Sequence, residues 1–130
     1  MILADTDVLV DFLAGVDPGA ARVQMELEHG QLFTTPINRF ELLSGSRSAR
    51  QGRLIRQLLD ALPCVAIDQA TADQAADLHR GLAQVDTPVS MNVCLIAAVA
   101  LRNRAQLLTR QREAFAGIPG VAFAAFADGE

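Results

Sequence analysis

The first thirteen residues constrain the fold more than any other stretch of the chain. A short apolar run over residues 1–4 ends at Asp5 and Asp7, and an apolar-periodic segment begins at Val8. This pattern predicts a buried strand that delivers a carboxylate to its C-terminal end and is followed at once by a helix. In open α/β sheets, ligands bind in the crevice beyond the carboxyl ends of the strands. We therefore expect Asp5 at a functional site.

The rest of the chain alternates between helical and strand patterns. Helices are expected over residues 8–13, 20–28, 36–44, 49–62, 68–82 and 92–102, with a loop over 83–89. Further strands are expected over residues 31–34, 63–67, 106–109 and 121–123. Strands that alternate with helices favour a parallel sheet with helices on both faces. We predict one α/β domain over residues 1–130, with α/β/α layers around a parallel sheet of four to five strands.

Composition and charge argue against several classes of protein. Apolar residues make up 51% of the chain, but no apolar run approaches the roughly 20 residues of a membrane-spanning helix. No basic segment precedes the first apolar run, so we expect neither a signal peptide nor a membrane partner. The two cysteines lack metal-ligand spacing and fit the reduced thiols of a cytoplasmic protein. A net charge of −4 argues against a protein that simply coats nucleic acid.

The basic residues are all arginines, and four of them recur at every third position, at Arg47, Arg50, Arg53 and Arg56. This spacing predicts one drifting face of a helix. One interpretation is a solvated helix face. The other is a rim that contacts phosphate groups beside an acidic site, because the arginine guanidinium suits bidentate phosphate contact.

Glu41 is a second candidate acid, because it lies on a mostly apolar helix next to Phe40 and Leu42. A carboxylate is costly to bury unless a cation or strong donors satisfy it. Glu41 is therefore either partly exposed at the helix edge or part of a carboxylate cluster that shares a hard cation. Mg²⁺ favours one or two carboxylates with waters and a substrate phosphate, and such ions activate water for in-line displacement at phosphorus.

Four segments together resemble a PIN domain, and most closely the VapC-type toxins of bacterial toxin–antitoxin pairs: residues 4–13, 35–45, 92–101 and 107–120. They occur in the family's order over essentially the whole chain. The resemblance implies a PIN-like fold and a Mg²⁺- or Mn²⁺-dependent endoribonuclease toxin that a cognate antitoxin holds inactive, commonly as a homodimer. It implies metal-binding and catalytic roles for Asp5 and Glu41. Thr109 matches the family's hydroxyl residue after the fourth strand.

The main departure from the family is Val93, which stands where the third metal-site acid is expected. Its neighbour Asn92 is neutral, so no small shift of register restores the charge. We therefore expect reduced Mg²⁺ affinity and nuclease rate. Asp7 could replace part of the lost charge, but at the start of a helix we expect it to point away from Asp5. We assign supporting positions to Thr6, Asp7, Asn92 and Thr109.

Two alternatives belong to other classes. Asp5-Thr6-Asp7-Val8 also resembles the nucleophile loop of haloacid-dehalogenase-type phosphatases, but that chemistry normally uses a lysine and this chain has none. A catalytically inactive PIN domain that only binds an antitoxin in an apolar groove is the stronger competitor. Two origins would explain Val93: a substitution engineered to disarm a toxic nuclease, or natural decay to such a binding module.

Overall fold

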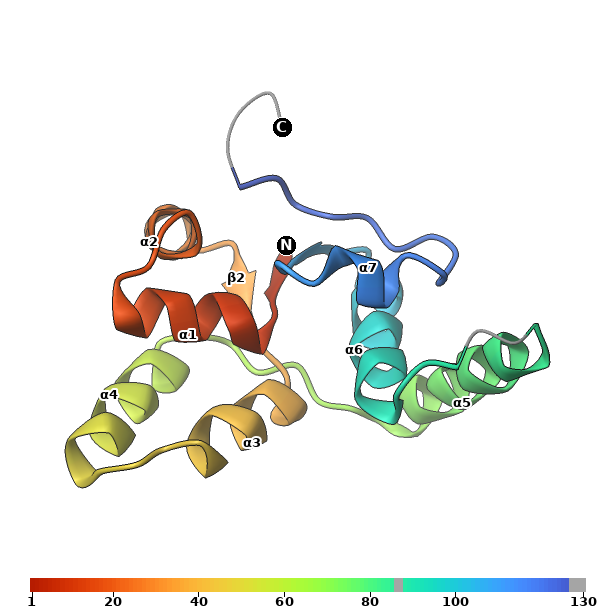
Figure 1. Cartoon of the computed structure of the whole chain (residues 1–130), viewed down its shortest axis with the longest axis horizontal. Helices are drawn as coiled ribbons and strands as arrows, with labels where there is room; N and C mark the ends of the chain where they lie inside the picture. Colours follow the sequence, from red (N-terminus) through yellow and green to blue (C-terminus); the bar gives the residue numbers. More distant parts are fainter. Residues whose placement is uncertain (86–87, 127–130) are drawn as a thin grey trace.

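The central strand β1 (Ile2–Ala4) organises the computed structural model, which describes residues 1–85 and 88–126 (Figure 1). β1 pairs in parallel with β2 (Leu32–Phe33) on one side and with β3 (Gln106–Leu108) on the other. The helices along the chain are α1 (Thr6–Ala14), α2 (Gly19–His29), α3 (Pro36–Ser44), α4 (Ala49–Asp60), α5 (Gln69–Gln84), α6 (Met91–Arg102) and α7 (Arg112–Phe115).

Side chains of β1 point alternately to two hydrophobic clusters, as the two-residue repeat of a strand requires. Ile2 and Ala4 pack in one cluster with residues of α1, α2 and α4. Leu3 packs in the other, which is built mainly on α6. Figure 1 shows α1 to α4 on one side of the strands and α5 to α7 on the other. The predicted α/β architecture with helices on both faces is confirmed.

The sheet is smaller than predicted, with three strands among the described residues. The segments predicted as strands over 63–67 and 121–123 each contribute a single parallel bridge, Thr34 to Cys64 and Leu107 to Phe123. At the bridge between Thr34 and Cys64, Pro63 has no N–H to donate to a ladder, and Cys64 is exposed. A longer strand there would therefore bury little apolar surface.

Helix boundaries differ from the predictions mainly at two places. α1 begins at Thr6, two residues before the predicted start at Val8, because the Asp5 side chain caps the helix. α5 continues to Gln84, into the loop predicted over 83–89; residues 86–87 of that loop lie outside the described residues. Within the described part of the chain, no helix has the length and apolarity needed to cross a bilayer.

Candidate active site

Asp5 occupies the junction between the central strand and α1. Its backbone is extended and its Oδ1 accepts a hydrogen bond from the Thr6 N–H at 2.9 Å, so it serves as the N-cap of α1. Because β1 lies between two strands, this junction is at the middle of the carboxyl edge of the sheet. The side chain is 8% exposed. The strand and the cap together hold the Asp5 carboxylate at one buried position.

Two side chains from distant parts of the chain also donate to Asp5. The Thr109 hydroxyl, which follows β3, lies 2.8 Å from Oδ2, and the Asn38 amide of α3 makes a longer contact of 3.5 Å to Oδ1. Burial raises the pKa of Asp5 above its ordinary value, and the hydrogen bonds from Thr109 and Thr6 offset part of that effect. Glu41 raises the pKa further through its charge.

Glu41 reaches the same region from α3. That helix starts with Thr35 as N-cap and Pro36 in its first turn, as the sequence pattern predicts. Glu41 is partly buried, and its Oε1 accepts a hydrogen bond from the Thr6 hydroxyl at 2.9 Å. Two acids from separate elements therefore face one another across Thr6.

A pocket of about 340 Å³ collects most of the residues that the sequence singled out. Its lining is contributed by the β1–α1 junction, α3, the first half of α6 with its N-cap, and α7 with its N-cap: Asp5, Thr6, Asp7, Glu41, Ser90, Asn92, Val93, Ile96, Gln111 and Phe115. Thr109 lies fully buried beneath it. Val93 is thus part of the wall of the pocket that Asp5 and Glu41 also line.

The orientation predicted for Asp7 is wrong. Asp7 lines the pocket with Asp5, and the Thr109 hydroxyl lies 3.4 Å from its Oδ2. The same oxygen accepts the Arg110 N–H at 2.9 Å. Because α1 begins at Thr6, Asp7 is in its first turn, and helical side chains tilt toward the N-terminus of the helix. Burial and the neighbouring charge of Asp5 raise the pKa of Asp7.

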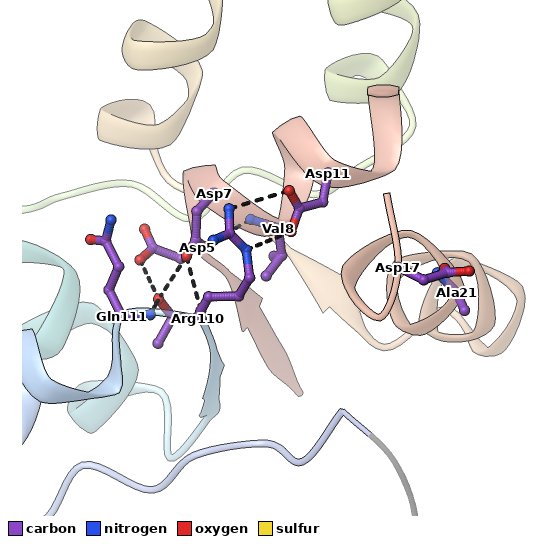
Figure 2. Close-up of polar contacts among 9 residues, drawn as sticks. Asp5, Asp7, Val8, Asp11, Asp17, Ala21, Arg110 and Gln111 are labelled. Carbon is purple, nitrogen blue, oxygen red and sulfur yellow. Dashed lines mark hydrogen bonds and ion pairs between the residues drawn. The ribbon is translucent and has the colours of Figure 1, made fainter. Parts of the chain in front are cut away.

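Arg110 forms an ion pair that the sequence analysis did not identify. Its Nε lies 2.6 Å and its Nη2 3.2 Å from the two carboxylate oxygens of Asp11, one turn after Asp7 on α1. Figure 2 shows the guanidinium lying along this face of the helix. Asp11 is buried, so the pair fastens the loop after β3 to α1. The four-residue spacing of Asp7 and Asp11 is the one sequence signal that indicated a shared face.

Asn38 is the second residue that the sequence analysis did not single out. It is fully buried, and its Oδ1 accepts a hydrogen bond from the Thr35 hydroxyl at 2.7 Å. Its Nδ2 donates to the Thr6 hydroxyl at 3.0 Å and makes the long contact to Asp5. Asn38 precedes Glu41 by three residues on the same helix face, a spacing that could have indicated its place beside the acids.

A larger groove of about 650 Å³ adjoins the pocket, and Glu41 lines both cavities. The groove lies between α1, α3 and α4 and is mostly apolar, with exposed Val10 and Leu54 among its lining residues. Of the predicted RNA-binding arginines, Arg47 and Arg50 line the groove, whereas Arg53 is exposed on α4 outside the lining.

The donor set of the pocket suits a hard divalent cation with few protein ligands. Mg²⁺ is commonly held by one or two carboxylates, with water and substrate phosphate completing the coordination. Asp5, Asp7 and Glu41 all line this cavity, and Asp7 Oδ2 also accepts the Arg110 N–H. Among residues 1–85 and 88–126, no three His, Cys, Asp or Glu side chains converge closely enough to hold a metal ion. The pocket therefore fits Mg²⁺ held by one or two of these carboxylates, whereas the Val93 side chain in the same wall offers no donor atom.

The comparison with known proteins agrees with this fold. The family model of the PIN domain matches residues 2–120, and the chain belongs to the PIN domain family. It is 29% identical to the ribonuclease VapC11 of Mycobacterium tuberculosis over 118 residues, which is 87% of this chain and 88% of the relative.

Solved structures give the same result for the fold. A toxin–antitoxin complex from Klebsiella pneumoniae contains a similar chain with 26% identity and a TM-score of 0.77, covering 98% of both chains. DNA-bound VapBC from Salmonella typhimurium is similar with a TM-score of 0.83 at 19% identity, covering 97% of this chain and 98% of that one.

Proposed function

We propose that this chain is an endoribonuclease toxin of a type II toxin–antitoxin pair, acting as a single PIN domain that hydrolyses RNA phosphodiesters. The observation that carries the proposal is the convergence of Asp5 and Glu41 on one pocket, each held by a threonine hydroxyl. Membership of the PIN domain family and the similarity to VapC ribonucleases support the same activity. The phosphatase alternative has no such support, because no lysine is available to neutralise an aspartyl phosphate.

In this proposal Asp5 and Glu41 hold Mg²⁺ or Mn²⁺. A bound ion of this kind activates water and stabilises charge on a phosphate undergoing in-line displacement. The protein's own contribution is to orient both carboxylates before substrate arrives. Thr109 donates to Asp5 and Thr6 donates to Glu41, so the remaining lone pairs of both acids are available to the pocket.

We further propose that Val93 impairs this site, because an apolar side chain replaces a negative charge in the pocket wall. The test compares the parent chain with its Val93→Asp and Val93→Asn variants. Both new side chains have nearly the same shape, and only the aspartate adds charge. We expect Val93→Asp to bind Mn²⁺ at least about tenfold more tightly and to cleave structured RNA faster, in a reaction that EDTA abolishes. Val93→Asn should resemble the parent.

Equal cleavage by the parent and Val93→Asp would show that Val93 does not impair the chain and that Asp7, Asn92 or a bound water completes the site. If neither chain cleaves RNA, the alternative of an inactive PIN domain that binds an antitoxin replaces the enzymatic proposal. Val93 in the pocket wall is the observation that favours this alternative.

The groove between α1, α3 and α4 provides a surface for both proposed partners. We propose that RNA phosphates contact Arg47 and Arg50, with Arg53 as a more distant contact, on the way to the pocket. We propose that the antitoxin fills the apolar floor of the same groove and places acidic groups near these arginines. The toxin–antitoxin complexes among the similar structures support such a partner. The resemblance to VapC-type toxins also favours a homodimer, which light scattering would report as twice the chain mass.

A further inference from the structure

The hydroxyls of Thr6 and Thr109 can each donate only one hydrogen bond, so the direction of that proton decides which acid receives it. A hydroxyl has one proton and two lone pairs. The Thr6 hydroxyl contacts the Glu41 carboxylate at 2.9 Å and the Asn38 amide nitrogen at 3.0 Å. A carboxylate can only accept and an NH₂ group can only donate. The Thr6 proton is therefore directed to Glu41, while Asn38 occupies a lone pair of the same oxygen.

The orientation of the Asn38 amide is itself fixed by its surroundings. Its NH₂ group faces the Asp5 carboxylate as well as Thr6, and the opposite orientation would place the amide oxygen against that carboxylate. Its oxygen accepts from the Thr35 hydroxyl, which in turn accepts the Asn38 backbone N–H at 3.3 Å. Hydrogen bonds therefore run in one direction from the cap of α3, through Asn38 and Thr6, to Glu41.

We propose that Asn38 is a positioning residue of this site: its amide sets the Thr6 hydroxyl to donate to Glu41 and braces Asp5. The inference rests on the proposed metal-dependent function. Asn38 fulfils this role from full burial and without lining the pocket. It acts on Glu41 only through Thr6, which gives a prediction that a purely structural role would not share. Loss of Asn38 and loss of Thr6 should affect metal binding through the same step.

The test measures Mn²⁺ affinity by electron paramagnetic resonance in the parent and in the Val93→Asp chain. Thr6→Val removes the hydroxyl with little change of shape, and Asn38→Leu removes the amide. Each should weaken Mn²⁺ binding by about tenfold, as loss of a group that orients a metal ligand typically does. The double variant should bind Mn²⁺ no more weakly than Asn38→Leu alone, because both substitutions break the same chain of hydrogen bonds and only Asn38 also contacts Asp5. Thr6→Ser should recover most of the affinity.

Thr71→Val is the matched control. Thr71 is buried and its hydroxyl donates to the Asp68 carboxylate at 2.6 Å on α5, away from the pocket. This variant should lower thermal stability without changing Mn²⁺ affinity. If Thr6→Val leaves the affinity unchanged, or if the two single effects multiply in the double variant, the positioning role is overturned.

A second readout does not depend on metal. In the parent, the Asn38 side-chain amide protons should exchange slowly with solvent, and Thr6→Val should accelerate that exchange at least about tenfold, because one proton loses its acceptor. Unchanged exchange would overturn the hydrogen-bond chain even if Asn38→Leu fails to fold. If neither chain binds Mn²⁺ while the exchange behaves as expected, the metal function fails, and the positioning role with it, while the hydrogen-bond chain stands.

Discussion

The ionised side chain of Asp7 is disfavoured by burial and by the adjacent Asp5 carboxylate, and backbone N–H groups of Val8 and Arg110 offset only part of this. Its pKa in the folded chain is therefore raised above the ordinary value of 3.8. An acid of this kind binds its proton more tightly in the folded than in the unfolded state. Its contribution to stability is complete below the unfolded pKa and is lost as pH rises through the folded pKa.

We accordingly expect Asp7→Asn to increase the free energy of unfolding at pH 7, because the neutral amide avoids the cost of a buried charge. The gain should shrink toward zero as pH falls below about 3.8. Urea denaturation in EDTA across this pH range measures it. Asp73→Asn, at an exposed position of α5, is the control and should change stability little at either pH. A gain independent of pH would contradict this account of Asp7.

Among the secondary-structure elements, β3 and α1 are tied together by the Arg110–Asp11 pair, whose members are 99 residues apart in sequence. Removing one member of a buried pair leaves the other charge without a partner. Asp11 is buried but the Arg110 side chain is about half exposed, with a relative exposure of 49%, so solvent screens part of the interaction. The pair should thus contribute more to the free energy of unfolding than a surface ion pair and less than a fully buried one.

We expect Arg110→Gln to lower the free energy of unfolding by roughly 1–2 kcal/mol, between the values typical of exposed and buried pairs. A double-mutant cycle with Asp11→Asn separates the pair from other losses. Arg80→Gln is the control, because it breaks an ion pair with Asp77 in which both side chains are about 70% exposed. Its effect should stay within about 0.5 kcal/mol. A vanishing coupling energy in the Arg110–Asp11 cycle would refute the fastening role.

The elements were predictable from sequence where a local pattern determines them. Thr35-Pro36 marked the start of α3 correctly, because capping depends on neighbours in sequence. Asp5 marked the end of β1, but the start of α1 was placed two residues late because the capping role of Asp5 was not recognised. Strand extent was overestimated at 63–67, since an apolar pattern does not specify how many ladder bonds form. The Asp11–Arg110 and Asn38–Thr6 contacts join distant segments, and no local periodicity encodes such pairs. The site acids were found through family motifs, while the residues that orient them were not.

For the molecule as a whole, the arrangement of arginines around the groove predicts how RNA binding depends on salt. Arg50 lines the groove that leads to Glu41, whereas Arg53 lies outside its lining. Each phosphate contact on single-stranded RNA contributes about 0.7 to the slope of log affinity against log salt. Arg50→Gln should weaken binding of a fluorescently labelled single-stranded RNA and reduce that slope by about 0.7.

Arg53→Gln provides the comparison, because it removes the same charge from the same helix. Its effect on affinity and on the salt slope should be clearly smaller than that of Arg50→Gln. Equal effects of the two variants would indicate general electrostatic attraction by α4 and would count against a path for RNA along the groove.

Glu41 forms part of the wall of both the pocket and the groove. Two ligands that meet at one side chain cannot bind independently, and thermodynamic linkage makes their coupling reciprocal. A partner that fills the groove and draws Glu41 toward itself would lower the affinity of the pocket for a cation by a certain factor. A cation in the pocket then weakens the hold on that partner by the same factor. If the proposed cation and the proposed antitoxin both engage Glu41, we expect the concentration of free divalent ions to set part of the affinity of the chain for its antitoxin.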